Sequence, residues 1–457
     1  MIGQWNLAQL QTQFGGELTQ DCAFTGVSTD TRSLQPGDLF VALVGPNFDG
    51  HNFIQQALDK GAVAAVVSRP LEQADLPQWL VEDTLIALGQ LALSNRQRFT
   101  GPVYAVTGSS GKTTVKEMLR SILAQHQQVL ATRGNLNNEI GVPLTLLELS
   151  DSDQVAVIEQ GASGAGEIAY TTSLSLPQVA ILNNAMGAHL EGFGSLQGVV
   201  EAKAEIYSQL AKTEGTAVIN LDDPHAEYWL KTTAGVRQTG FSTEYPEADL
   251  RASHIETADN GCYSFLLHRG EENRPVRLQV MGKHNVANAL AAAAAVSARG
   301  MPLEQIVSGL EAFTAVAGRM KPLKAAGAVV IDDSYNANPG SVAAAMDLLV
   351  SLPGESVLVL GDMAELGEDA QAQHEKVGCR AAQKGVGRFW ATGALSRHSV
   401  SAYQSESAGE GRHFETREEL INALREVAGP GVNILVKGSR SAAMDQVVAG
   451  LTKGEEE

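Results

Sequence analysis

The chain has 457 residues, of which 44% are hydrophobic and 19% charged, and it contains 46 glycines. That length suits about three domains of ordinary size, and the composition excludes a disordered, collagenous or fibrous chain. Lys and Arg total 33 against 52 Asp and Glu, so the formal net charge is −19. Because so acidic a surface repels a polyanion, the charge argues against a general nucleic-acid binder and no nucleic acid is expected as a partner, although a local basic site is compatible with it.

Cysteine usage and apolar runs both favour a cytoplasmic protein. Cys22, Cys262 and Cys379 lie far apart without metal-ligand spacing, which fits a reducing compartment. The first residues lack the basic region and apolar core of a secretory signal. The most apolar run, residues 289–298, is about half as long as a membrane span. We therefore expect a cytoplasmic protein with no membrane span.

Short apolar strands alternate with helix-length segments along the whole chain. In chain order the strands are expected at 37–43, 62–68, 103–108, 154–161, 179–184, 216–221, 328–334, 356–362 and 433–439, with a hairpin at 262–282. Strands that are apolar on both faces and separated by helices are typical of parallel sheets covered on each side, so the predicted fold class is α/β. Shifts in composition predict domains at 1–82, 83–315 and 316–457.

The segment 103–123 carries the most specific signal for function. A strand ends at Thr107, a loop of Gly and Ser follows, and from Lys112 onward the apolar residues have helical spacing. Glycines in such a loop let backbone N–H groups turn toward phosphate oxygens at the positive end of the helix. Lys112 is expected to reach the β and γ phosphates, and Thr113 to place its hydroxyl on Mg²⁺. The predicted nucleotide-binding residues of the loop are Gly108, Ser109, Ser110, Gly111, Lys112, Thr113 and Thr114.

This loop is shorter than the general phosphate-loop pattern. Gly108 and Gly111 have two residues between them, fewer than the Walker A motif has. A plain turn followed by a chance Lys-Thr pair is the alternative, but the order strand, loop, helix favours nucleotide binding. The short loop also argues against a GTPase or an ordinary kinase.

The sequence of the loop, TGSSGKTTVKE at 107–117, resembles that of the ATP-dependent Mur ligases of peptidoglycan assembly. Further matching motifs lie at 28–53, 132–147, 158–168, 183–195, 201–206, 282–292, 317–320, 332–341, 361–367 and 437–444. The resemblance implies a uridine-nucleotide domain, a central ATPase domain with a phosphate loop and parallel sheet, and a C-terminal Rossmann-like domain. It implies that ATP phosphorylates the terminal carboxylate of a UDP-N-acetylmuramoyl-tripeptide and that the amine of D-Ala-D-Ala attacks the acyl phosphate.

A metal site is predicted beside the loop. Glu159 ends an apolar strand, where parallel sheets have their ligand crevice, and with Thr113 and phosphate oxygens it suits Mg²⁺. The resemblance implies a pair of Mg²⁺ ions and adds His189 and Lys203 as ligands. It also implies that CO₂ carbamylates Lys203, which turns a cation into an anionic oxygen ligand. Without the resemblance, His189 is an ordinary polar group and Lys203 a solvated surface cation.

The resemblance extends to the nucleotide and to phosphate. It places the adenine at Asn285 and Asn288, and further nucleotide contacts at Arg319 and Asp333. It assigns a phosphate or acyl-phosphate contact to Asn138, with Asn137 as the alternative. Asparagines at such positions could instead cap helices, and the charged residues could lie on the surface.

Substrate contacts are predicted in turn-rich loops of the first domain and in the motif DSYNANPGS at 333–341. These residues are Ser28, Thr29, Asp30, Arg32, Asp49 and His51, together with Tyr335 and Asn336. Ordinary turn chemistry is the alternative. For Arg32 we expect either a diphosphate contact or a structural ion pair.

Two other functions remain in view. An enzyme of the folylpolyglutamate synthetase type shares the central and third domains but is disfavoured by the uridine-domain motif before the loop. A regulatory or mechanical P-loop ATPase is disfavoured because Glu159, His189 and Lys203 occur together. We expect a monomer in which ATP draws the second and third domains together.

Overall fold

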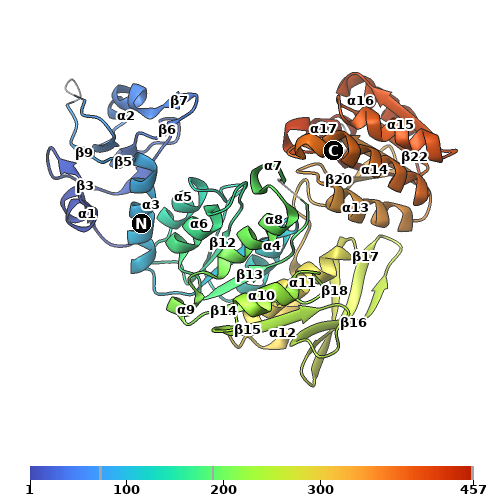
Figure 1. The fold of residues 1–457 in the computed structure, drawn as a ribbon, viewed down its shortest axis with the longest axis horizontal. Coiled ribbons are helices and arrows are strands. Elements are labelled where there is room, and N and C mark those ends of the chain that lie inside the picture. The colour runs from blue at the N-terminus through green and yellow to red at the C-terminus, as the bar shows by residue number, and fades with distance from the viewer. Residues whose placement is uncertain (72–74, 188–189, 454–457) are drawn as a thin grey trace.

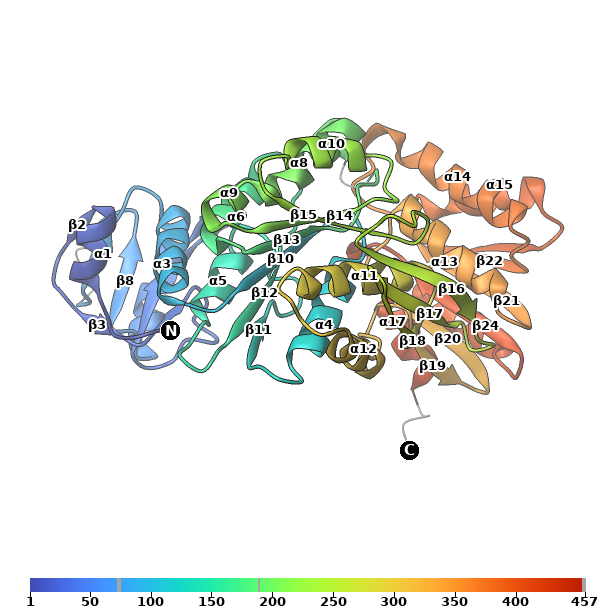
Figure 2. The ribbon, with the colours of Figure 1, turned by 90° about the horizontal axis from the view of Figure 1, so that it is seen from below.

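The computed structural model describes residues 1–71, 75–187 and 190–453. These residues form an N-terminal, a central and a C-terminal part, with the first and last at opposite ends of the central part (Figures 1 and 2). Each part has its own mixed or parallel sheet, which confirms the α/β class and the three-domain organisation. The predicted boundaries after residues 82 and 315 stay predictions. No described helix has both the length and the hydropathy to cross a bilayer.

The N-terminal part is built on a sheet in the order β2-β9-β8-β5-β4, in which only β2 is antiparallel. Its elements are β1 Trp5–Asn6, α1 Leu7–Phe14, β2 Glu17–Leu18, β3 Ala23–Phe24, β4 Gly26–Ser28, β5 Asp38–Val41, β6 Val44–Gly45, β7 Phe48–Asp49, η1 Gly50–Phe53, α2 Ile54–Asp59, β8 Ala64–Val67, β9 Gln78–Leu80 and α3 Thr84–Arg98. Asp83 caps α3 by accepting hydrogen bonds from two backbone N–H groups of its first turn. Leu88 and Leu91 of this helix share one core with Trp79 of the first sheet and Ile158 of the central sheet. Helix α3 therefore fastens the first part to the second.

The central part has a sheet in the order β11-β12-β10-β13-β14-β15-β16-β17-β18. It is parallel from β11 to β16 and antiparallel beyond, so the predicted hairpin at 262–282 is confirmed as β17 and β18. Its elements are β10 Val103–Thr107, α4 Lys112–Leu123, β11 Val129–Ala131, α5 Gly141–Leu147, β12 Val155–Glu159, α6 Glu167–Ser175, β13 Val179–Leu182, α7 Leu190–Phe193, α8 Leu196–Ala204, η2 Glu205–Tyr207, α9 Leu210–Thr213, β14 Thr216–Asn220, α10 Ala226–Thr232, β15 Arg237–Ser242, β16 Leu250–Thr257, β17 Cys262–Arg269, β18 Glu272–Met281, α11 His284–Ser297 and α12 Leu303–Ala312.

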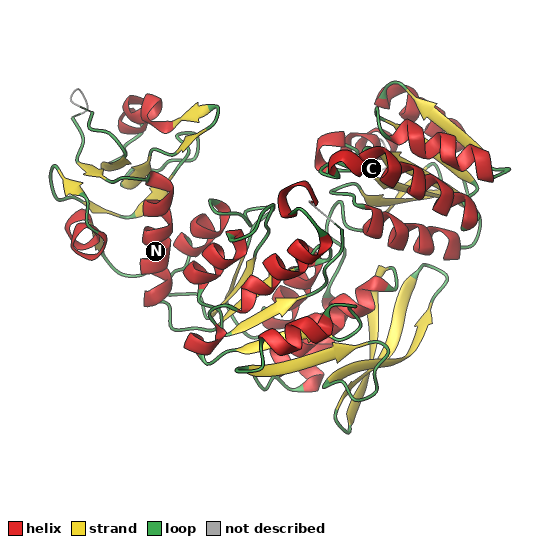
Figure 3. Ribbon diagram, viewed as in Figure 1, coloured by secondary structure: helices red, strands yellow, loops and turns green. Residues whose placement is uncertain are grey.

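The central strands are buried on both faces because helices cover each side of the sheet. Helices α6, α8 and α10 lie on one side, and α4, α11 and α12 on the other (Figures 2 and 3). Every residue of β10, β12, β13 and β14 is buried. The alanines at 291–295 are fully buried in α11, where their small side chains let the helix pack closely on α4. The carboxyl ends of β10, β12 and β13 are therefore rigidly placed beside one another.

The C-terminal part has a sheet in the order β19-β20-β24-β21-β22-β23, in which only β19 is antiparallel. Its elements are β19 Lys321–Ala325, β20 Ala328–Asp333, α13 Pro339–Ser351, β21 Glu355–Gly361, η3 Gly367–Asp369, α14 Ala370–Gln383, β22 Arg388–Thr392, α15 Ser396–Glu406, β23 Glu410–Phe414, α16 Arg417–Val427, β24 Val432–Lys437, η4 Arg440–Ala442 and α17 Asp445–Thr452. Met281, at the end of β18, packs into the core of this part beside Leu348 and Leu352. This contact sets the C-terminal part against the start of α11.

Candidate active site

The phosphate loop joins β10 to α4, as the sequence predicts. Gly111 occupies the N-cap position of α4 with a φ of 77°, a left-handed conformation that favours glycine. A Cβ atom there would lie 2.5 Å from both Asn183 Nδ2 and Asn288 Oδ1. Position 111 therefore excludes a side chain for two independent reasons.

Two asparagines that follow β13 contact the loop, and sequence reasoning did not single them out. Asn183 Nδ2 donates to Ser110 O at 3.1 Å, and Asn184 Nδ2 donates to the same oxygen at 3.2 Å. The preceding loop residue, Ser109, donates a hydrogen bond from its hydroxyl to Met186 O at 3.0 Å. The signals available in the sequence were two polar residues directly after an apolar strand and their place in the matching motif at 183–195.

Lys112 lies in the first turn of α4 and points back over the loop. Its Nζ donates to Gly108 O at 2.8 Å. Burial lowers the pKa of Lys112, Glu159 opposes that shift, and Arg319 adds to it. The Lys112 ammonium therefore lies where the phosphates of a nucleotide bound to the loop would be.

Glu159 ends β12 beside the loop and is 2% exposed. Its Oε1 accepts a hydrogen bond from Asn137 Nδ2 at 2.9 Å, and Lys116 Nζ lies 3.8 Å from its Oε2. Oε2 has no hydrogen-bond donor among the described residues. A buried carboxylate oxygen without a donor is costly, and a hard cation with oxygen preference would satisfy it. The residues present thus fit a Mg²⁺ ion at this point.

The structure places Asn137 and Asn138 in different roles. Asn138 Oδ1 accepts from the backbone N–H of Gly141, the first residue of α5, at 2.9 Å. Asn137, the alternative weighed from the sequence, is the one that contacts Glu159.

Lys203 is buried in α8 and is not the solvated surface cation that its helix alone would predict. Its exposed fraction is 2%, and its Nζ lies 5.4 Å from the ring centroid of Phe193. Burial and then Lys112 lower the pKa of Lys203 to about 7, against the opposing effects of Glu205 and Glu167. His189, predicted as a metal ligand, lies outside the described residues.

The asparagines predicted to contact adenine are buried near the start of α11. Asn285 Nδ2 donates to Met281 O at 2.7 Å, and Asn288 Nδ2 donates to Asn285 Oδ1 at 2.8 Å. Asn288 Oδ1 in turn accepts from Asn183 Nδ2 at 2.9 Å. Their amides form a chain of hydrogen bonds that reaches the phosphate loop through Asn183, and an adenine contact by either residue stays a prediction.

The C-terminal part reaches the phosphate loop through Arg319. Arg319 Nη2 donates to Thr113 Oγ1 at 3.2 Å, and its guanidinium lies 4.0 Å from the ring centroid of Tyr335. Asp333 lies at the end of β20, where Lys437 Nζ donates to its Oδ2 at 2.5 Å. That oxygen of Asp333 is therefore held in a buried ion pair.

Asn336 lines a cavity of about 420 Å³ at the carboxyl ends of β20, β21 and β24. Ser439 and Arg440 line the same cavity, on the segment that follows β24. The Arg440 guanidinium lies 5.9 Å from the ring centroid of Tyr335, which has Arg319 nearer to it. Tyr335 thus lies between the phosphate loop and this cavity, at the edge where parallel sheets bind ligands.

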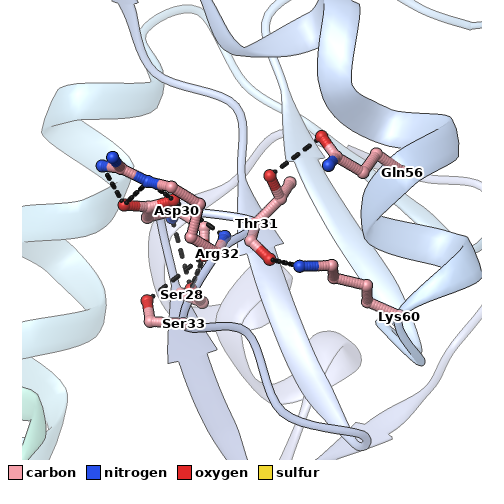
Figure 4. A network of polar contacts seen from close by, with 7 residues as sticks. All are labelled: Ser28, Asp30, Thr31, Arg32, Ser33, Gln56 and Lys60. Atoms are coloured by element: carbon pink, nitrogen blue, oxygen red, sulfur yellow. Dashed lines mark hydrogen bonds and ion pairs between the residues drawn. The ribbon is translucent and has the colours of Figure 1, made fainter.

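The predicted substrate residues after β4 form a local polar network (Figure 4). Ser28 donates to Asp30 O at 3.0 Å, and Arg32 Nη2 lies 2.6 Å from Asp30 Oδ2. The Arg32 side chain is 88% exposed, so the structural ion pair leaves its remaining donors facing solvent. Thr29 is half-buried within the same turn.

His51 is directed into the protein. Its Nδ1 lies 2.7 Å from Asp49 Oδ1, and its Nε2 accepts from the backbone N–H of Ser68 at 3.0 Å. Because Nε2 accepts, Nδ1 carries the proton that is donated to Asp49. Arg69 and then His51 hold the pKa of Asp49 well below its usual range. Both ring nitrogens of His51 are therefore hydrogen-bonded within the protein.

Known protein families match this arrangement part by part. The Mur ligase family, catalytic domain, matches residues 23–96, the Mur ligase middle domain matches 106–296, and the Mur ligase, glutamate ligase domain, matches 318–440. The chain belongs to the Mur ligase family.

Individual relatives are similar over almost the whole chain. The UDP-N-acetylmuramoyl-tripeptide--D-alanyl-D-alanine ligase of Escherichia coli (strain K12) is 46% identical over 97% of this chain and 98% of its own length. A crystal structure of MurF from Acinetobacter baumannii has a TM-score of 0.91 at 36% identity, covering 99% of each chain. MurF ligase from Thermotoga maritima in complex with ADP has a TM-score of 0.84 at 28% identity, covering 94% of this chain and 97% of that one.

Proposed function

We propose that the protein is an ATP-dependent amide ligase that joins a UDP-N-acetylmuramoyl-tripeptide to D-Ala-D-Ala. The observation that carries this proposal is the contact of Arg319 with Thr113, which brings the cavity of the C-terminal part to a phosphate loop beside a buried carboxylate. The relatives named above support the choice of both substrates. The cytoplasmic location and the monomeric state remain predictions.

The proposed reaction has two steps. A carboxylate oxygen of the tripeptide attacks the γ-phosphorus of ATP, the bond to the bridging oxygen breaks, and ADP leaves. The amine of the dipeptide then attacks the carbonyl carbon of the acyl phosphate, loses a proton, and expels phosphate. The protein contributes by positioning the reactants and by placing cations where charge develops. Lys112 and Arg319 are the described cations at the loop.

Thr113 and Glu159 would hold Mg²⁺ at this site. When bound, the ion would neutralise phosphate oxygens and polarise the phosphorus. Asn137 fixes one oxygen of Glu159 and leaves the other without a hydrogen bond from the described residues. The binding of Mg²⁺, including the predicted second ion with His189, remains a proposal.

Lys203 is proposed to carry a carbamate. Its nitrogen would form a bond with the carbon of CO₂ and release a proton, which converts a buried amine into an anion. Burial favours this step because it disfavours the ammonium, and only the neutral amine has a lone pair with which to attack CO₂. The product would offer oxygen ligands beside the phosphate loop.

The two substrates are proposed to bind on either side of the loop. The cavity beside Tyr335 suits the dipeptide, because Arg440 can bind a carboxylate through its planar fork. The turn that carries Asp30 and Arg32 is proposed to meet the uridine nucleotide.

The test is phosphate release from ATP by the full chain. We expect release only when UDP-N-acetylmuramoyl-tripeptide and D-Ala-D-Ala are both present, and little with single amino acids in place of the dipeptide. Mass spectrometry should show a product that has gained the dipeptide. Phosphate release that does not depend on the dipeptide would overturn the assignment.

A further inference from the structure

The phosphate loop is braced from a neighbouring strand. Strands β10 and β13 are parallel neighbours, so the residues that follow them emerge at the same edge of the sheet. The backbone N–H of Ser109 donates to Asn184 O at 3.0 Å, and the backbone N–H of Ser110 donates to Asn184 Oδ1 at 2.9 Å. Asn184 Nδ2 returns a hydrogen bond to Ser110 O at 3.2 Å. One side-chain amide thus binds both the N–H and the carbonyl of a single loop residue.

This arrangement changes which donors remain for an anion. The serine N–H groups that a phosphate loop would ordinarily turn toward its ligand are already bound to Asn184. The first N–H groups of α4 have no partner within the helix and start at Gly111. An anion at this loop would therefore be held mainly by the N–H groups at the start of α4 and by Lys112. Its binding then depends on how α4 is oriented relative to the loop.

The phosphate loop is short, which explains why it needs the brace, meaning the hydrogen bonds between Asn184 and the loop residues Ser109 and Ser110. With only two residues between Gly108 and Gly111, the loop has few groups with which to bond itself. Gly108 has a φ of 155° and Gly111 a φ of 77°, conformations that a flexible loop would sample among many others. Hydrogen bonds from outside the loop select one conformation before a ligand arrives.

We propose that Asn184 is a positioning residue that holds the phosphate loop in its nucleotide-binding conformation in the absence of nucleotide. The inference rests on the proposed use of this loop for ATP and adds how the loop is kept ready. Asn184 acts through Ser110 and is not itself proposed to touch the nucleotide. Without these hydrogen bonds the loop must become ordered each time nucleotide binds. This cost weakens the affinity for nucleotide without altering the bound complex.

The first test measures ADP binding by calorimetry in the full chain and in Asn184→Ala. We expect the Kd to rise about ten- to a hundredfold, as for two lost hydrogen bonds of ordinary net strength. The apparent KM for ATP should rise in parallel, while kcat at saturating ATP stays within about twofold, since the interaction is lost before chemistry begins. Asn433→Ala is the matched control, because that buried asparagine donates to Pro353 O at 3.0 Å in the C-terminal sheet.

A purely structural role predicts a different result. Both variants would then unfold at lower temperature, and both would keep the wild-type Kd for ADP. That outcome would overturn the inference, as would a loss of kcat at saturating ATP with an unchanged Kd. A wild-type chain that binds no ADP would instead overturn the proposed function, and the inference with it.

The second test needs no variant. Hydrogen–deuterium exchange in the nucleotide-free wild-type chain should show slow exchange at the amides of Ser109 and Ser110, because both already donate to Asn184. ADP should add little protection at these amides and more at Lys112 and Thr113. Fast exchange at both serines that becomes slow only with ADP would contradict a braced loop.

Discussion

Replacing Gly111 with alanine tests whether the phosphate loop is packed as closely as its surroundings indicate. The left-handed backbone costs an alanine about 1–2 kcal/mol. The new methyl group would lie 2.5 Å from the amide ends of Asn183 and Asn288, which are hydrogen-bonded to each other. Making room in a packed site costs a further ~1–3 kcal/mol, which corresponds to about 5- to 150-fold in affinity if the loop shifts to relieve the overlap.

Gly385 offers a matched control for the backbone effect. Its φ of 75° is close to the 77° of Gly111, and a Cβ atom there would meet nothing within 4 Å. Gly385→Ala should therefore carry the conformational cost alone and keep wild-type ADP affinity. Calorimetric titration of both variants with ADP measures the difference. Equal ADP affinity in the two variants would refute the claim that position 111 is closed to a side chain.

Further substitutions test the neighbouring groups. Glu159→Gln keeps an acceptor for Asn137 but removes the anionic oxygen. The affinity of the ADP complex for Mn²⁺, measured by electron paramagnetic resonance, should therefore fall about tenfold or more, which corresponds to ~1.4 kcal/mol. An unchanged Mn²⁺ affinity would exclude this carboxylate as a metal ligand. Lys203→Met should abolish formation of the amide product, yet it should raise the thermal stability of the protein in CO₂-free buffer. Because the folded pKa of Lys203 is about 7 against an ordinary 10.5, the unfolded chain binds more protons between these values. Wild-type stability should rise with pH across that window, so the advantage of the variant should be largest near pH 7 and fade toward 10.5; a pH-independent difference would contradict the assigned burial. Arg319→Ala removes the contact with Thr113 and should raise the KM for ATP, and small-angle scattering should show a less compact nucleotide complex than the wild type forms; equal compactness would argue against closure through this residue.

Much of the fold was predictable because its strands are apolar on both faces. Each apolar run predicted to be a strand is one, from β5 to β24, and the helix after the phosphate loop begins at Lys112. Strands such as β16 and β23 were missed, since they alternate buried and exposed residues or lie at a sheet edge and so resemble loops. Hydrophobic runs report burial on both sides, and partly exposed strands leave a weaker pattern.

The site was predictable where a residue lies next to a marked strand end. Glu159 and Lys112 are such residues, and both face the loop. The contacts of Asn184 were not predictable, because they depend on β13 being the spatial neighbour of β10. The hydrogen bonds of His51 were likewise not predictable: both of its ring nitrogens bind within the protein, and its contact with substrate stays a prediction.

The central claim is that ATP activates the tripeptide as an acyl phosphate before the dipeptide amine attacks. The most direct measurement uses tripeptide substrate labelled with ¹⁸O in its terminal carboxylate, followed by mass analysis of the phosphate released in the presence of D-Ala-D-Ala. The carboxylate oxygen that attacks the γ-phosphorus must leave with phosphate, so one ¹⁸O atom per phosphate is expected at full labelling. Phosphate without ¹⁸O, formed together with the amide product, would contradict it.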